Sequence, residues 1–394
     1  MKTNIPPSEF GPNDFDELVQ IAQHEGVEAS LNFLEQRFRT DKKFFQLFEV
    51  LKMQCRHRLG LPLIYGTRPD ELDEERQRQL EDALLAGCSE IGTLLIANGQ
   101  LEQGWMYLQP VGNRALIESV IRDIPVDSEN IGTVIEIAVS QGAAPVYGFG
   151  LLMEHYGTCN AITTIDTQGM RFDQPTQKGM AELLLRHLYR ELCANLHRLI
   201  DRSGKSTAAS TSLAGLLTEH PWLIEGGAHH IDATHLASVM RIARVVDETD
   251  DLRRALELAN YGSSLQADFQ YASPAPFEQT YPDHQFFYAG LLGHDLPAAI
   301  QHFTAKCQSV DSERFGGVAF ETLADFLMRV GQTDAAIAVL TEQLLGKHEP
   351  LGIAPQIFQL AETPDQLAVV QKYFLQNEDL LSFGISLLQA KIRS

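Results

Sequence analysis

The residues best suited to chemistry lie in the stretch EGGAHHIDATHLASVM at 225–240. Imidazole nitrogens and carboxylate oxygens are ligands that Zn²⁺ and similar divalent ions accept. Asp232 and His235 are three residues apart and would share one face of a helix, and His230 lies just upstream. The pattern therefore predicts a divalent metal site in which His230, Asp232 and His235 are the ligands. Zn²⁺ is the candidate ion.

The same stretch also fits an ordinary helix start. Asp232 directly precedes an apolar run, where its carboxylate would accept hydrogen bonds from the free backbone amides of the first turn. Gly226 and Gly227 would supply the turn that leads into it. Capping explains the aspartate but not the histidines on both sides of it, so both interpretations stay open.

A second group of polar, reactive side chains occurs in EHYGTCN at 154–160, after the apolar run VYGFGLLM. Gly157 is expected to end that helix, which would leave these side chains in a loop, where functional residues concentrate. Glu154 would be a general base, with His155 beside it. Cys159 is an alternative nucleophile. A plain helix end with a buried thiol explains the stretch as well.

The third group is TYPDH at 280–284, which follows a proline-rich segment and has aromatic residues on both sides. Asp283 and His284 beside an aromatic-lined pocket would suit a small ligand. The competing interpretation is a helix start, in which threonine caps the helix, proline occupies the first turn and Asp283 reaches back toward the cap.

These three groups predict one shared site if the helix ends that carry them meet at one rim. A bound divalent ion would polarise a carbonyl or activate water, and a carboxylate would act as the base. The hypothesis is a metal-supported hydrolase or lyase that acts on a small polar substrate. Its catalytic residues would be Glu154, His155, Asp283 and His284.

The elements that must position these residues are predicted to be helices. Residues 233–247 place apolar side chains at spacings of three and four, and residues 178–200 carry a leucine stripe of the same period. Alternating strand patterns are scarce. The exception is AITTID at 161–166, where β-branched residues predict a short extended segment.

The helices also repeat. A glycine, a short polar turn and an Ala-Ala-Ile helix begin at Gly293 and again at Gly331, 38 residues later, and each follows another helix. Looser copies begin at Gly99 and Gly26. Glycine suits the left-handed conformation at a helix end, and stacked helix pairs can share a continuous core.

Residues 293–345 resemble tetratricopeptide-like repeats in this Gly and Ala-Ala-Ile pattern, although the spacing is longer than the usual unit. The resemblance implies an all-α fold of stacked helix–turn–helix pairs. Such repeats commonly present a concave surface to another protein. A non-catalytic, protein-binding scaffold is therefore the alternative to the enzyme.

Composition sets the remaining expectations for this chain of 394 residues. We expect an N-terminal helical region at 1–201, a polar linker or loop at 202–212 and a helical-repeat region at 213–394.

The net charge of -21 argues against nucleic acid and against a membrane surface as partners. The five scattered cysteines favour reduced thiols and a cytoplasmic location.

Overall fold

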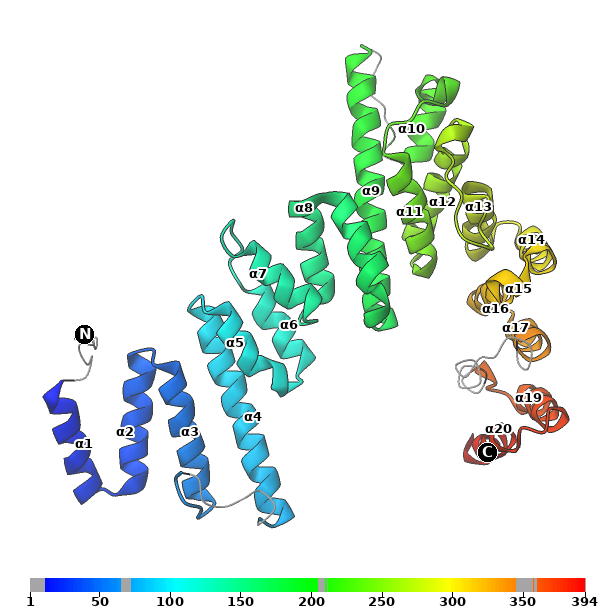
Figure 1. The fold of residues 1–394 in the computed structure, drawn as a ribbon. Helices are drawn as coiled ribbons and strands as arrows, with labels where there is room; N and C mark the ends of the chain where they lie inside the picture. The colour runs from blue at the N-terminus through cyan, green and yellow to red at the C-terminus, as the bar shows by residue number, and fades with distance from the viewer. Residues whose placement is uncertain are drawn as a thin grey trace. The chain divides into compact units, whose positions relative to one another are not determined.

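The fold is known from a computed structural model, which describes residues 11–64, 72–204, 210, 212–344, 357 and 360–393. Every regular element within these residues is helical, so the all-α prediction is confirmed for them (Figure 1). The chain divides into two compact units between Glu154 and His155. None of the described helices is long and apolar enough to cross a membrane.

The first unit begins with helices joined by short turns. They are α1 (Pro12–His24), α2 (Val27–Thr40), α3 (Phe44–Arg58), α4 (Glu74–Ala97), α5 (Leu101–Leu108), η2 (Gln109–Val111), α6 (Arg114–Arg122), α7 (Ile131–Ile135) and the π-helical turn η3 (Glu136–Ser140). Successive helices from α1 to α5 pack on one another. The helix α8 (Pro145–Gln168) starts in this unit and continues into the second.

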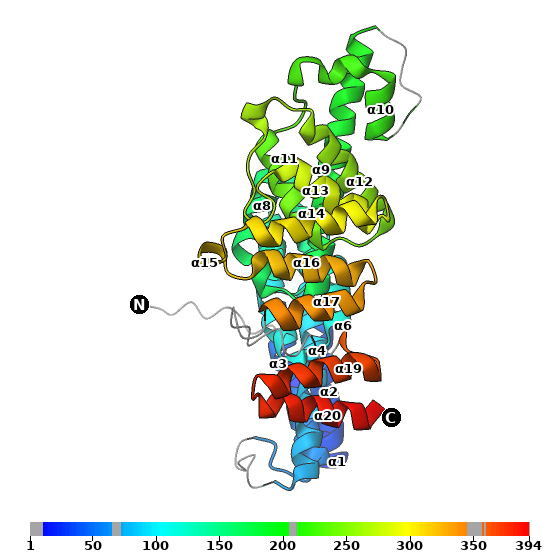
Figure 2. The same cartoon turned by 90° about the vertical axis from the view of Figure 1, so that its right-hand side faces the viewer.

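The second unit is built around the longest helix, α9. Its elements are η4 (Gly169–Arg171), α9 (Gln174–Arg202), α10 (Leu213–Glu219), η5 (Pro221–Gly227), α11 (Ala233–Ile242), η6 (Ala243–Val245), α12 (Thr249–Ser263), η7 (Ala267–Phe269), α13 (Thr280–Leu291), α14 (Leu296–Ser309), α15 (Ser312–Phe315), α16 (Val318–Arg329), α17 (Thr333–Val339), η8 (Leu340–Leu344), α19 (Pro364–Gln376) and α20 (Leu380–Arg393). Figure 2 shows a stack of successive helices, each of which packs on the next, namely α13, α14, α16, α17, α19 and α20.

Apolar stripes of helical period hold both units together. In the second unit the predicted leucines Leu185, Leu188, Leu192 and Leu196 of α9 are fully buried, whereas Leu199 is only partly so. In the first unit α4 and α5 approach closely at Gly92 and Gly104. A Cβ on either glycine would lie within 3 Å of the other glycine's carbonyl oxygen. This approach exists because neither residue has a side chain.

The four glycines singled out by the repeat pattern behave as predicted. Gly26, Gly99, Gly293 and Gly331 all have positive φ angles, between 76° and 89°, which other residues rarely adopt. Each one joins two helices that pack on each other, namely α1 with α2, α4 with α5, α13 with α14 and α16 with α17. The sequence pattern therefore located real helix–turn–helix pairs.

The extended segment predicted at 161–166 is wrong, because these residues belong to α8. The hydroxyls of Thr163 and Thr164 donate to the carbonyls of Cys159 and Asn160, four residues earlier, at 2.9 and 2.8 Å. A threonine that bonds back to the preceding turn fits a helix despite its branched Cβ.

The loop expected at 154–160 is a break of one residue. Gly157, at φ 83°, is the residue of α8 that leaves the helical conformation, and helix resumes directly after it. Asn160 spans the break, because its side-chain amide donates to the Tyr156 carbonyl at 2.7 Å. The polar residues on both sides therefore lie on helical turns.

Residues 202–212 connect α9 to α10, although residues 205–209 and 211 lie outside the described part of the chain. Both flanking helices belong to the second compact unit, and α9 packs against α10, α11 and α12. In the structure this polar segment therefore connects elements of one unit.

Candidate functional site

Asp232 is the N-cap of α11. One carboxylate oxygen accepts the backbone amides of Thr234 and His235, at 2.8 and 3.1 Å, together with the Thr234 hydroxyl. The hydrogen bond from this hydroxyl is the largest contribution that lowers the pKa of the Asp232 carboxyl. The capping interpretation of this aspartate is therefore confirmed.

His230 forms structural hydrogen bonds rather than facing Asp232. Its Nε2 lies 2.6 Å from the Leu223 carbonyl, and its backbone amide donates to the Tyr261 hydroxyl at 2.7 Å. Its own carbonyl accepts the Asn195 side-chain amide. These contacts tie η5 to α9 and α12, and they occupy one of the two ring nitrogens of His230.

The predicted catalytic residues around the break in α8 are exposed. Glu154, His155 and Cys159 all lie on the surface of this helix. Within the described residues no hydrogen bond joins Cys159 to a histidine. The described contacts therefore include no hydrogen-bonded base for the proposed nucleophile.

Asp283 has a different environment, because its side chain is fully buried beneath α14. Its carboxylate accepts His302 Nε2 at 2.9 Å and Lys306 Nζ at 2.8 Å, and it also accepts the Gln279 backbone amide. Burial opposes ionisation, but these partners outweigh it and lower the pKa of the carboxyl. Asp283 thus accepts the backbone amide of the N-cap residue Gln279 and fastens α14 to α13.

His284 is enclosed by aromatic rings. It stacks on Phe277 with ring centroids 4.4 Å apart, and its Nδ1 is hydrogen-bonded to the Thr280 carbonyl. Burial lowers the pKa of the imidazole to about 3. The ring is therefore neutral at physiological pH and out of reach of a substrate in solution.

The contacts of the described residues do not join the predicted residues into one site. No hydrogen bond, ion pair or ring contact in the described part of the chain links the groups around 155, 230–235 and 283. Nor does any set of three His, Cys, Asp or Glu side chains among those residues form a group that could hold a metal ion. The donor set expected for Zn²⁺ is thus not gathered at Asp232.

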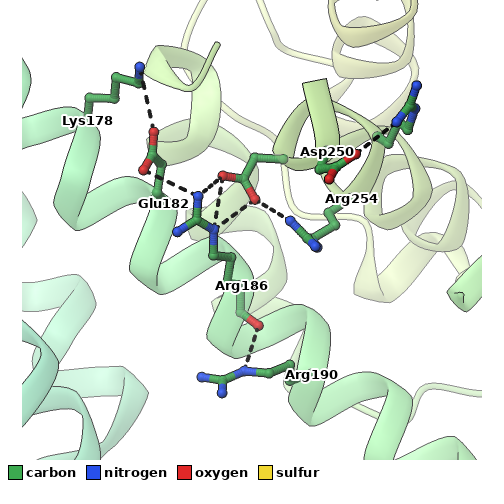
Figure 3. A network of polar contacts seen from close by, with 8 residues as sticks. Lys178, Glu182, Arg186, Arg190, Asp250 and Arg254 are labelled. Atoms are coloured by element: carbon green, nitrogen blue, oxygen red, sulfur yellow. Dashed lines mark hydrogen bonds and ion pairs between the residues drawn. The ribbon is translucent and has the colours of Figure 1, made fainter. Parts of the chain in front are cut away.

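A different group of charged residues does converge, along α9. Lys178, Glu182, Arg186 and Arg190 follow one another at intervals of four and share one face of the helix (Figure 3). Arg186 reaches across to α12 and holds the fully buried Asp251 with Nε at 3.0 Å and Nη2 at 2.6 Å. This face forms a groove, which we call the α9–α12 groove.

Asp251 is shared between two arginines, because Arg254 Nη1 also donates to it at 2.6 Å. The hydrogen bond to Asp251 is the main contribution that raises the pKa of Arg186. Arg190, by contrast, donates only to the Arg186 carbonyl and forms no ion pair within the described residues. The groove therefore carries a guanidinium that is available at its surface.

A second hollow of about 960 Å³ adjoins the groove and shares Pro175 and Lys178 with it. We call it the Arg244 hollow. Its walls come from α9, α11, η6, α12, α13 and α16, and it includes Arg241, Arg244, Phe277, Phe287, Asp325 and Arg329.

Arg244 is the unusual residue of this hollow. Its guanidinium lies 4.6 Å from the Phe277 ring centroid, and its Nε donates to the Arg241 carbonyl at 2.9 Å. No carboxylate of the described chain forms an ion pair with it, and burial lowers its pKa. An arginine stays charged even so, which leaves a poorly solvated cation on the wall of an open hollow.

Arg329 fixes the shape of the hollow from α16. Its two terminal nitrogens donate to the backbone carbonyls of Arg244 and Val246, at the end of η6. Asp325 stands 3.8 Å from the same guanidinium. The neighbouring cations have partners already, since Arg241 pairs with Asp166 and Lys178 with Asp247. Among the described cations that line this hollow, Arg244 is thus the one without an ion pair.

Sequence reasoning missed this site for a physical reason. The four-residue spacing of charges on α9 is visible in the sequence, but it is also typical of a solvated helix face. Arg244 stands within the apolar run of 236–246 and gives no separate signal. Its importance comes from the contact with Phe277 and from the absence of an ion pair with any described carboxylate, which are tertiary facts.

Comparison of the chain with models of protein families, with curated proteins and with solved structures finds no match in any of the three.

Proposed function

We propose that this protein is a non-catalytic scaffold of tetratricopeptide-like helix pairs that binds a partner protein through the Arg244 hollow. The partner would insert an acidic segment, and one of its carboxylates would pair with Arg244. The single observation that carries this proposal is the partly buried guanidinium of Arg244, which forms no ion pair with any described carboxylate and interacts with Asp325 of the same hollow only at longer range.

The charge balance of the hollow supports an anionic ligand. The chain as a whole is strongly acidic, with 31 basic and 52 acidic residues. Yet basic residues equal acidic ones in the lining of the hollow and the adjoining groove combined. An acidic segment would be repelled by most of the surface and less so here, which favours one binding position over others.

The shape favours a peptide segment over a small molecule. The hollow continues along α9 into the α9–α12 groove through the shared residues Pro175 and Lys178. Arg190, at the other part of this groove, offers a second unpaired guanidinium. An extended segment with two separated carboxylates would satisfy both arginines, whereas a compact metabolite would reach only one.

The metal-supported hydrolase or lyase has less support. It required seven residues to meet, namely Glu154, His155, His230, Asp232, His235, Asp283 and His284. His230 and Asp232 have structural partners of their own, and His284 is buried. It remains testable through metal content, as described below.

A peptide-display selection against the purified protein tests the proposal. We expect the selected sequences to share acidic residues at fixed positions. Arg244→Gln should weaken binding of a selected peptide about tenfold or more, because a charge-assisted hydrogen bond at a desolvated site contributes on the order of 1.5–3 kcal/mol. Fluorescence anisotropy of the labelled peptide provides the Kd.

Arg253→Gln is the matched control, because Arg253 lies on α12, pairs with Asp250 and lines neither hollow nor groove. This variant should bind the peptide as the unaltered protein does. A glutamine in place of the critical peptide carboxylate should cost nothing further in Arg244→Gln. Selection without acidic preference, or equal affinity for both variants, contradicts the proposal.

A further inference from the structure

The final described helix, α20, packs on α19 with one side and leaves an apolar stripe on the other. Its inner side carries the buried Ser382 and Ser386, with Phe383 and Ala390 against the core. Its outer side exposes Leu381, Ile385, Leu388 and Ile392, at 75%, 37%, 63% and 83%. A folded chain rarely leaves such a row of large apolar side chains in water unless something covers it.

The spacing of this stripe is that of a helix–helix seam. Its members are four, three and four residues apart, which is the alternation that places apolar knobs along a two-helix contact. Gly384 stands beside the stripe, and a Cβ there would meet no atom of the described chain within 4 Å. Packing within the chain therefore does not explain a glycine in the middle of this helix, whereas close approach of a second helix does.

The spacing of the stripe is symmetric along the helix. The intervals of four, three and four residues are the same in both directions, so the stripe is symmetric about a point between Ser386 and Leu387. A twofold axis through that point would set Leu381 against Ile392 of a second copy and Ile385 against its Leu388. Every contact would then join a leucine to an isoleucine, as an isologous interface requires.

Charge favours the antiparallel direction. Glu378 and Asp379 precede α20, and Asp379 caps it by accepting the Ser382 amide at 3.0 Å, whereas Lys391 lies in its last turn. Antiparallel pairing brings the acidic end of one helix to the basic end of the other and opposes the two helix dipoles. Parallel pairing would bring like charges together at both ends.

We propose that α20 pairs antiparallel with α20 of a second copy of this chain, which makes the protein a reversible homodimer. A seam of one helix about 21 Å long is short, so we expect dissociation in the micromolar range, on the order of 10 µM. The dimer is independent of the Arg244 hollow and does not rest on the proposed peptide binding.

Sedimentation velocity of the full chain from 1 to about 100 µM tests this dimer. The mass should rise with concentration from the monomer value of 43.9 kDa toward twice that value. Leu388→Glu should remain monomeric throughout with an unchanged circular dichroism spectrum, because its side chain is already 63% exposed. Met170→Glu, at a side chain 99% exposed outside α20, is the control and should dimerise normally. A monomer at all concentrations, or a dimer that survives Leu388→Glu, overturns the proposal.

Direction is tested by oxidative crosslinking with peptide mapping. An equimolar mixture of Leu381→Cys and Ile392→Cys chains should form a 381–392 disulfide. Leu381→Cys alone should form no 381–381 disulfide, since those positions would be about 16 Å apart along an antiparallel pair. A 381–381 disulfide shows parallel pairing and overturns the arrangement.

Discussion

His284 is a residue of catalytic type in an environment that prevents catalysis. Its ring is stacked between Phe277 and Tyr288, and burial lowers the pKa of the imidazole to about 3. In the unfolded chain the same imidazole titrates near 6.5. The unfolded state therefore binds the proton first as pH falls, and the folded state loses relative stability between about pH 6.5 and pH 3.

This titration gives a pH prediction. Between pH 7 and pH 5 the free energy of unfolding should fall about 2 kcal/mol more in the unaltered protein than in His284→Phe, which has no proton to bind. Urea denaturation at the two pH values measures it. Because each variant is compared with itself, any packing cost of phenylalanine cancels. Equal pH dependence in both proteins would show that the imidazole is not held neutral.

Asp283 supports a second residue prediction. Asp283→Asn should destabilise the protein by about 3 kcal/mol, because it removes the buried counter-charge of Lys306 and breaks the link to His302. Glu278→Gln is the control, since Glu278 is half exposed, pairs with the same lysine and should cost less than about 0.5 kcal/mol. Chemical denaturation at pH 7 compares them, and similar losses in both variants would contradict the assigned role.

Local roles at these positions were predictable from sequence, and partners were not. The capping role of Asp232 and the return of Asp283 toward its helix start follow from spacing within a few residues. His302 and Lys306 come from the following helix, and Asp251 meets Arg186 from 65 residues away. The candidate site depends on which charged side chains have ion-pair partners. Those partners can be identified only from the fold.

At the scale of elements, glycine determines where two helices come closest. A Cβ on Gly262 of α12 would lie 2.2 Å from the ring of Tyr281, which is fully buried on α13. Gly262→Ala should therefore lower the free energy of unfolding by about 1–3 kcal/mol. Thermal and urea unfolding measure the loss.

Gly169→Ala is the control for this change. Its added Cβ would make only an ordinary contact, 3.5 Å from Ile165, so stability should change little. If Gly262→Ala were tolerated equally well, α12 and α13 would not be in the close contact described.

Repeat patterning predicted the helix pairs better than residue preferences predicted single segments. Glycine marked four turns, two of them followed by Ala-Ala-Ile at a fixed offset, because a positive φ angle and a close helix contact both restrict residue type. The β-branched residues at 161–166 led to the wrong prediction of an extended segment, because the intrinsic preference of a residue for strands is weak compared with the hydrogen bonds of a long helix. The break at Gly157 was predicted, but the helix that resumes after it was not.

At the scale of the whole molecule, the scaffold proposal and the enzyme hypothesis differ in metal content. We expect protein purified without a histidine tag to contain less than about 0.2 divalent metal ion per chain, and a chelator to leave its melting temperature unchanged. Elemental analysis and thermal unfolding measure these quantities. Stoichiometric zinc that is lost in His235→Ala would instead support the metal site.

The hydrogen bonds of Arg329 have a consequence for how the second unit comes apart. Ideal helical arrays are stabilised only by contacts between neighbouring helix pairs, and they can unfold from one end, one helix pair after another. Here a side chain of α16 satisfies backbone carbonyls more than eighty residues earlier, and the ion pair of Arg186 with Asp251 ties α9 to α12. If α16 detached, those carbonyls would lose their hydrogen-bond donors. We therefore expect α9 to α16 to unfold as one cooperative unit, while α19 and α20 can unfold separately.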